Sequence, residues 1–141
     1  MALTDAQKTR ANKLRAVIDK VIATSTDDVA TINTLDVFIL DWAEGSYTIG
    51  DVRMYNGAPY KCVQAHDSTG NSTWNPTVAS LWMQYHGTTQ DSARDWVAPT
   101  GSHDMYKVGE YMIFTDGNTY KCLVDTAYSP TDYAAAWQIV T

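Results

Sequence analysis

The first pair of residues in the chain that could bind a metal ion is a cysteine and a histidine four residues apart. Cys62 and His66 have a spacing that suits two metal ligands, because thiolate and imidazole both bind zinc. A tetrahedral site needs four ligands, and no second cysteine–histidine pair completes the set, so we predict no metal and no cofactor. For Cys62 and Cys122, buried free thiols are favoured, and the alternatives are a disulfide between the two and, least favoured, metal binding.

The chain contains no recognisable catalytic motif. Its histidines, His66, His86 and His103, each lie near an acid or a hydroxyl, but none has a nucleophile-like setting, and no serine lies in a G-x-S-x-G sequence. Asp51 and Glu110 stand singly at matched positions, where a carboxylate is typical of an acceptor that stabilises a turn. We therefore predict that the protein is not an enzyme.

The length and composition predict one ordinary domain or two very small ones. Of the 141 residues, 45% are hydrophobic and only 18% are charged, which excludes a disordered chain. No apolar run approaches the ~20 residues that cross a bilayer, so we predict no membrane span. The first 15 residues include five charged ones and no apolar core, so we expect no signal peptide.

The charge is acidic and unevenly distributed. The net charge of −6 argues against a body that binds nucleic acid phosphates. The first 24 residues nevertheless hold five basic and two acidic side chains. A solvated helix face explains this segment better than a nucleic acid contact, because no aromatic residues alternate with the bases. We therefore predict no nucleic acid partner.

The N-terminal segment predicts a helix with one apolar stripe. Thr4 and Gln7 have the spacing of a capping box, in which each side chain bonds the backbone of the other. The stripe that follows at helical spacing consists of Leu14, Val17, Ile18, Val21 and Ile22. It is too apolar to face water, so it should cover the repeats described below, dock on a partner, or bind copies of itself.

A second short helix is predicted after Ser25-Thr26. Its apolar side would consist of Val29, Ile32 and Leu35. Residues 37–40 are all apolar, and their pattern fits either the end of this helix or the start of a strand, so both alternatives stay open. We assign residues 1–40 to one helical segment for docking or oligomerisation.

The rest of the chain contains an internal repeat. Residues 41–85 and residues 95–141 share eleven identical positions in the same order. The matched pairs are Asp41/Asp95, Trp42/Trp96, Tyr47/Tyr106, Gly50/Gly109, Gly57/Gly117, Tyr60/Tyr120, Lys61/Lys121, Cys62/Cys122, Pro76/Pro130, Thr77/Thr131 and Trp82/Trp137. The polar residues 86–94 between the two copies are predicted to be a linker.

Each copy predicts a β-hairpin. Asn56-Gly57 and Asp116-Gly117 lie between short alternating apolar runs, and both dipeptides tolerate the positive φ angles of tight turns. The fold class is therefore mainly β with an α-helical N-terminus (α+β), with two small three-strand β modules in tandem. The pairs Tyr60/Tyr120 and Cys62/Cys122 should occupy equivalent buried places.

The first copy resembles carbohydrate-binding modules of families 5 and 12, small β modules known from chitinases. The segments that carry the resemblance are Trp42, Tyr47-Thr48-Ile49-Gly50-Asp51-Val52, Tyr55-Asn56-Gly57 and Tyr60-Lys61-Cys62. The continuation is similar to a variant of phage and prophage proteins that follows a short helical N-terminus. It consists of Cys62-Val63-Gln64-Ala65-His66-Asp67-Ser68, Trp74-Asn75-Pro76 and Leu81-Trp82.

The aromatic residues divide into two groups. Four tryptophans recur in both copies and are predicted to be core, namely Trp42, Trp82, Trp96 and Trp137. Trp74 and Tyr128 lie instead in polar loops at matched positions, each two residues before a proline, and we select them as ligand-binding residues. The alternative, that each ring folds back over its own module, stays open.

The chain departs from chitin-binding members of the families at one place. Those members carry adjacent exposed aromatics directly after the Y-x-A/C strand, as a platform for sugar rings. Residues 63–65 are Val-Gln-Ala here and residues 123–125 are Leu-Val-Asp, so this platform is absent.

The resemblance implies a non-enzymatic protein of a phage or prophage particle, made in the bacterial cytoplasm. It would be a tail or tail-fibre accessory that contacts a host surface glycan or neighbouring virion proteins, and that self-associates as a trimer by analogy with phage fibres. Two alternatives are a purely structural decoration or cement protein, and a secreted polysaccharide-binding module.

Overall fold

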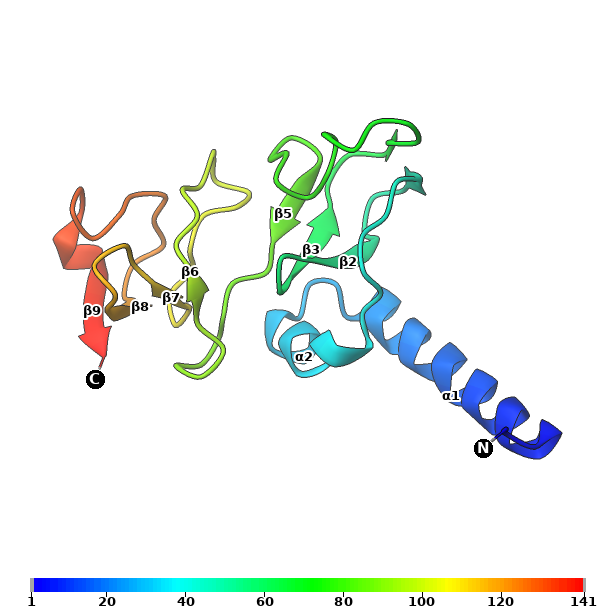
Figure 1. Ribbon diagram of the computed structural model, residues 1–141. Helices are drawn as coiled ribbons and strands as arrows, with labels where there is room; N and C mark the ends of the chain where they lie inside the picture. The colour runs from blue at the N-terminus through cyan, green and yellow to red at the C-terminus, as the bar shows by residue number, and fades with distance from the viewer. Residues whose placement is uncertain (1, 141) are drawn as a thin grey trace.

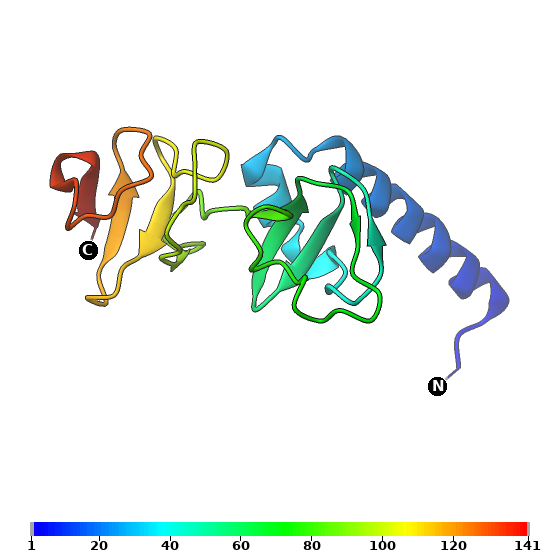
Figure 2. The same cartoon turned by 90° about the horizontal axis from the view of Figure 1, so that it is seen from above.

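The computed structural model describes residues 2–140 and places three parts in a row (Figures 1 and 2). The helix α1 (Asp5–Thr24) projects at one end, one β unit lies in the middle, and a second β unit forms the other end. The predicted capping box is confirmed. The Thr4 amide donates to Gln7 Oε1 at 2.8 Å, and the Gln7 amide donates to Thr4 Oγ1 at 3.1 Å.

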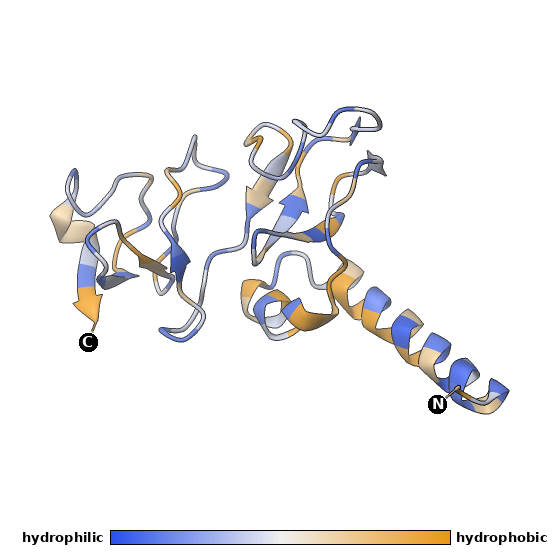
Figure 3. Ribbon diagram, viewed as in Figure 1, coloured by the Kyte–Doolittle hydropathy of each residue, from blue (hydrophilic) through white to orange (hydrophobic). Residues whose placement is uncertain are grey.

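The predicted second helix is α2 (Val29–Thr34), and Asp28 is its N-cap residue. The Asp28 carboxylate accepts from the Thr31 amide at 3.1 Å, as is typical of an N-cap. Apolar residues concentrate on α2, on the turn after it, and on the end of α1 nearest to them (Figure 3). This cluster joins the helices to the first β unit; its buried members are Ile22, Ile32, Ile39, Val52 and Tyr85.

Residues 37–40 contain both of the structures that the sequence left open. The 3-10 helix η1 (Asp36–Phe38) closes the helical segment, and Ile39 is already extended. The Leu40 carbonyl then accepts from the Met54 amide at 2.8 Å, and Asp41 forms a parallel bridge with Met54. The chain therefore enters the first β unit along the edge of its hairpin.

The first β unit contains two small antiparallel sheets. Its strands are β1 (Ser46–Tyr47), β2 (Val52–Tyr55), β3 (Ala58–Cys62), β4 (His66–Asp67) and β5 (Trp82–Gln84). One sheet has the order β2-β3-β5, and β1 pairs with β4 in the other. Asn56 (φ 50°) and Gly57 (φ 79°) form the tight turn between β2 and β3, which confirms the first predicted hairpin.

Each unit was predicted to have three strands, but among the described residues the first has five and the second has four. The elements of the second unit are β6 (Arg94–Asp95), β7 (Tyr111–Ile113), β8 (Thr119–Cys122), η2 (Ala134–Ala136) and β9 (Trp137–Val140). The order is β6-β7-β8-β9, and the predicted hairpin β7–β8 is confirmed. The extra strand β6 pairs in parallel with β7 over two residues. Such a short pairing uses backbone atoms alone and leaves no periodic pattern in the sequence.

Matched positions of the two units make the same hydrogen bonds. The Gly50 amide donates to the Cys62 carbonyl at 2.9 Å, and the Gly109 amide donates to the Cys122 carbonyl at 2.9 Å. Each cysteine thiol lies 3.1 Å from the carbonyl oxygen two residues further on and donates to it. Tyr60 and Tyr120 are also both buried, so the predicted burial of these pairs is confirmed.

Aromatic side chains fill both cores, as expected for units too small to bury a deep aliphatic interior. Trp82 and Trp137 are buried, and Trp42 and Trp96 pack against the cores while partly exposed. The prediction that these four tryptophans belong to the cores is therefore confirmed. No helix among the described residues is long and apolar enough to cross a membrane.

Residues 86–94, which were predicted to be a linker, connect the two units and contact both of them. His86 and Gly87 are buried, and the Gly87 carbonyl accepts from the Tyr111 amide at 2.8 Å. Arg94 donates to Asn33 Oδ1 at 2.7 Å and to the Tyr85 carbonyl at 2.7 Å. Hydrogen bonds therefore join the second unit both to α2 and to the end of the first unit.

A buried acid–imidazole pair lies at the centre of this junction. His86 Nδ1 lies 3.0 Å from Glu110 Oε1, and both residues are 7% exposed. The imidazole also stacks on the ring of Tyr106, with centroids 3.7 Å apart. Glu110 was predicted to stabilise a turn, and its carboxylate does accept from the Lys107 amide at 2.7 Å. Its second contact, with His86, crosses between the units.

Candidate functional site

Trp74 lies on the long loop between β4 and β5 and is 44% exposed. Two asparagines stiffen the backbone on either side of it. Asn71 Oδ1 accepts from the Thr73 amide at 3.2 Å, and Asn75 Oδ1 accepts from the Thr77 amide at 3.0 Å. The loop therefore holds the indole ring at the surface at a small cost in conformational entropy.

Trp74 is one wall of a shallow surface groove of about 480 Å³. The other lining residues are Gln64, Ala65, His66, Val78, Ser80 and Leu81. A sugar ring has an apolar C–H face and a polar rim of hydroxyl groups. An exposed indole face can stack on the apolar face, and the neighbouring amide and hydroxyl groups can form hydrogen bonds with the rim. The sequence did not predict the contribution of Gln64 and Ser80, since neither is distinguished by composition or by the repeat.

His66 positions the floor of this groove. Its Nδ1 lies 2.7 Å from the Gln64 carbonyl, which only accepts, so Nδ1 carries the proton. The imidazole also packs against the rings of Tyr47 and Trp82, with centroids 5.7 and 5.5 Å apart. His66 therefore fixes the turn that carries Gln64, which is a structural role rather than that of a metal ligand.

The two cysteines are free thiols, each buried in its own unit. Burial raises the pKa of both thiols, to about 11 for Cys122. Each thiol therefore stays protonated at neutral pH, which suits a core side chain and not a nucleophile. Among residues 2–140, no three His, Cys, Asp or Glu side chains lie close enough together to hold a metal ion.

Tyr128 lies at the matched loop position of the second unit and is 64% exposed. Its carbonyl accepts from the Trp137 indole Nε1 at 3.0 Å, and its amide donates to Thr126 Oγ1 at 3.0 Å. The backbone at Tyr128 is therefore fixed while its ring faces solvent. Trp74 and Tyr128 belong to different units, and the groove beside Trp74 is lined by residues of the first unit alone.

The apolar stripe of α1 divides into a covered part and an exposed part. Ile22 is buried in the cluster beneath the first β unit, and Ile18 packs against the same cluster. These two residues are therefore removed from the predicted docking surface, because the body of the protein already covers them. Leu14 (61% exposed), Val17 (59%) and Val21 (39%) remain free to bind a partner.

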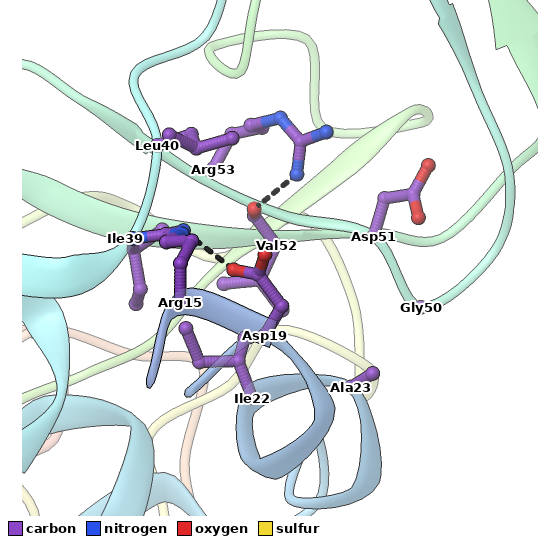
Figure 4. A pocket seen from close by; sticks show the side chains of 10 residues that line it. All are labelled: Arg15, Asp19, Ile22, Ala23, Ile39, Leu40, Gly50, Asp51, Val52 and Arg53. Carbon is purple, nitrogen blue, oxygen red and sulfur yellow. Dashed lines mark hydrogen bonds and ion pairs between the residues drawn. The ribbon is translucent and has the colours of Figure 1, made fainter. Parts of the chain in front are cut away.

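A hollow of about 250 Å³ lies where α1 meets the first β unit (Figure 4). Its charged side chains already have partners. Arg15 pairs with Asp19 at 2.6 Å, Arg53 donates to the Val52 carbonyl at 2.7 Å, and Asp51 accepts from the Thr48 amide at 2.8 Å. We therefore interpret the hollow as the joint between helix and unit, and not as a ligand site.

A known protein family matches the part of the chain that contains Trp74. No relative among the curated proteins matches the chain. The family described as Carbohydrate-binding module family 5/12 matches residues 41–83, which span the first β unit from Asp41 to Met83. The match includes both strands of the first hairpin and the loop with Trp74. The chain therefore contains a carbohydrate-binding module of family 5/12 at residues 41–83.

Proposed function

We propose that this protein is a non-enzymatic glycan-binding protein that uses the exposed ring of Trp74 as its main contact. The observation that carries the proposal is the position of Trp74, which is 44% exposed on a stiffened loop inside the family 5/12 module. A buried ring at this place would have favoured a purely structural role. Gln64 and Ser80, on the same groove, supply hydrogen bonds to the hydroxyl groups of the sugar.

We also propose that residues 95–141 are a second module of the same kind, although the family match covers only the first. The support is the repeat of eleven identities together with the matched hydrogen bonds of Gly50/Cys62 and Gly109/Cys122. Tyr128 is the outward ring of this module. One stacked aromatic binds a sugar weakly, and two linked modules raise the avidity by a factor of roughly 10² or more where both engage one surface.

The setting that we propose is a phage or prophage particle, as a tail or tail-fibre accessory that meets a host surface glycan or neighbouring virion proteins. Its support is the likeness of residues 62–68 and of the Trp74-Asn75-Pro76 segment to the phage variant of the module, placed behind a helical N-terminus. The alternative of a decoration protein without a glycan ligand predicts no role for the exposed rings of Trp74 and Tyr128.

Retention on insoluble chitin tests the glycan-binding proposal. The aromatic platform that chitin-binding members carry is absent at residues 63–65, so retention on chitin has to rest on Trp74. Wild-type protein should co-sediment with chitin, and Trp74→Ala should weaken retention about tenfold, since a stacked aromatic contributes on the order of 1–1.5 kcal/mol. Tyr128→Ala should also weaken retention, because it removes the outward ring of the second proposed module and with it the avidity of two linked modules. Equal retention of wild type and both variants would contradict the proposal. If Trp74→Ala failed to fold, the Trp74 ring would be a core side chain and not a ligand contact.

The exposed part of α1 supports self-association, which we propose to be trimeric. Leu14, Val17 and Val21 lie on one face of the helix and are exposed in the single chain. Sedimentation should therefore give about three times the chain mass of 15.6 kDa. The double variant Leu14→Glu, Val17→Glu should sediment as a monomer, and Asn12→Glu, on the opposite face, should not. A wild-type monomer at high concentration would overturn this prediction.

A further inference from the structure

The exposed side of α1 carries basic as well as apolar side chains. Residues three, four or seven positions apart lie on the same side of a helix. On the exposed side of α1 these are Arg10, Lys13, Leu14, Val17, Lys20 and Val21. This set, which we call the basic face, contains no acidic residue, and none of its cations has an ion-pair partner among residues 2–140.

The basic face is unsuited to packing against copies of itself. Helices joined along this face would bring the same three cations of every chain together, and like charges at such short range repel. A partner surface for the basic face therefore has to combine apolar area with negative charge. The rest of the chain carries such charge, since residues 25–141 include fourteen acidic and only five basic side chains.

A hollow of about 400 Å³ between η1 and the β2–β3 turn has this combination. Asp36 and Asp41 line it, and neither carboxylate has an ion-pair partner among residues 2–140. Trp42 and Tyr55 line it as well, with perpendicular rings whose centroids are 5.8 Å apart. Val37, which is 80% exposed, adds an aliphatic surface. We call this hollow the acidic groove.

The acidic groove has the features that bind a lysine or arginine side chain. The methylene stem of such a side chain packs on apolar and aromatic surface while its charged end stays in a polar environment. A cation within about 6 Å of an aromatic ring is attracted by the π-electrons, and a nearby carboxylate adds a charge-assisted hydrogen bond. Trp42 and Tyr55 supply the rings, and Asp36 and Asp41 supply the carboxylates.

We infer that the acidic groove of one chain binds the basic face of α1 from a second chain, with the cations of Arg10 and Lys13 at the groove carboxylates. This inference rests on the proposed self-association and adds to it the surface that α1 contacts. The two surfaces differ, so the contact is heterologous, and a ring closes when each helix occupies the groove of the next chain. The helix projects beyond the β units, which leaves its N-terminal half accessible to another chain (Figure 1).

Charge reversal on the two surfaces, followed by sedimentation of the full-length protein, tests the inference. The helix variant Arg10→Glu, Lys13→Glu should sediment as a monomer at concentrations where the wild type is assembled, because an acidic helix then meets an acidic groove. The groove variant Asp36→Asn, Asp41→Lys should also be monomeric, because both surfaces are then basic. The combined variant with all four substitutions should regain the wild-type mass, because its acidic helix meets a basic groove.

Lys8→Glu, on another side of α1, and Asp91→Lys, outside the groove, are the matched controls and should assemble as the wild type does. The inference is overturned if the groove variant assembles normally, or if the combined variant stays monomeric. Self-association through α1 would still stand if only the helix variants dissociated. A monomeric wild type would contradict self-association and this inference together, whereas the glycan-binding proposal depends on the chitin retention of Trp74→Ala alone.

Discussion

Replacing Trp137 with alanine should lower the free energy of unfolding by about 3–5 kcal/mol, the usual cost of removing a buried tryptophan. Trp137 is 6% exposed and is the ring around which the second core packs. Its centroid lies 6.0 Å from Trp96, 5.3 Å from Tyr106 and 6.5 Å from Tyr120. The variant also removes the donor to the Tyr128 carbonyl, so the loop that presents that ring should lose its order.

Urea denaturation followed by tryptophan fluorescence measures this effect. Trp74→Ala is the matched control, because it removes the same side chain from an exposed loop and should change the free energy of unfolding by less than about 1 kcal/mol. Comparable destabilisation by the two variants would contradict the division of the tryptophans into core and surface rings.

Glu110→Ala should destabilise the protein by about 3 kcal/mol and loosen the two β units relative to each other. The carboxylate accepts from His86 Nδ1 and from the Lys107 amide, and all three groups lie at the junction. Alanine leaves a buried imidazole and a backbone amide without an acceptor. The expected result is a lower urea midpoint together with faster amide exchange at the neighbouring Gly87–Tyr111 contact.

Glu110→Gln separates hydrogen bonding from charge. Its side-chain carbonyl still accepts, so it should recover most of the stability that Glu110→Ala loses. An alanine variant as stable as wild type would show that the His86–Glu110 contact does not hold the units together. A glutamine variant as unstable as alanine would show that the negative charge, and not the hydrogen bond, is what His86 requires.

Local features of the fold could be predicted from the sequence because they depend on neighbouring residues. The capping box of Thr4 and Gln7 and the hairpin at Asn56-Gly57 each need only a few adjacent side chains. The internal repeat added the expectation that Cys62 and Cys122 share an environment, because identical residues in identical order favour identical packing. The structure places both thiols in the same bonding pattern.

Contacts between distant segments could not be predicted in this way. Arg94 reaches Asn33, 61 residues away, and nothing local to either residue indicates the pairing. For the same reason the contacts of residues 86–94 with both units could not be predicted. Helical periodicity likewise identified the apolar stripe on α1. It carries no information on which end of the stripe the first unit covers, and Ile22, which lies at the covered end, was therefore included in the predicted docking surface.

The candidate site was partly predictable. The polar neighbours of Trp74 and the proline after it indicated an exposed ring, and the structure places that ring on a groove. The partners of Trp74 come from the turn after β3 and from the loop before β5, so they became visible only when the chain was folded.

The most direct test of the account is a titration of ¹⁵N-labelled wild-type protein with N,N′,N″-triacetylchitotriose, followed at the indole N–H signals. We predict a saturable shift of the Trp74 signal, with the core tryptophans Trp42, Trp96 and Trp137 unchanged, because sugar stacks on the exposed ring while their cores stay packed. An unmoved Trp74 signal at tens of millimolar oligosaccharide would contradict the claim that this ring is the glycan contact.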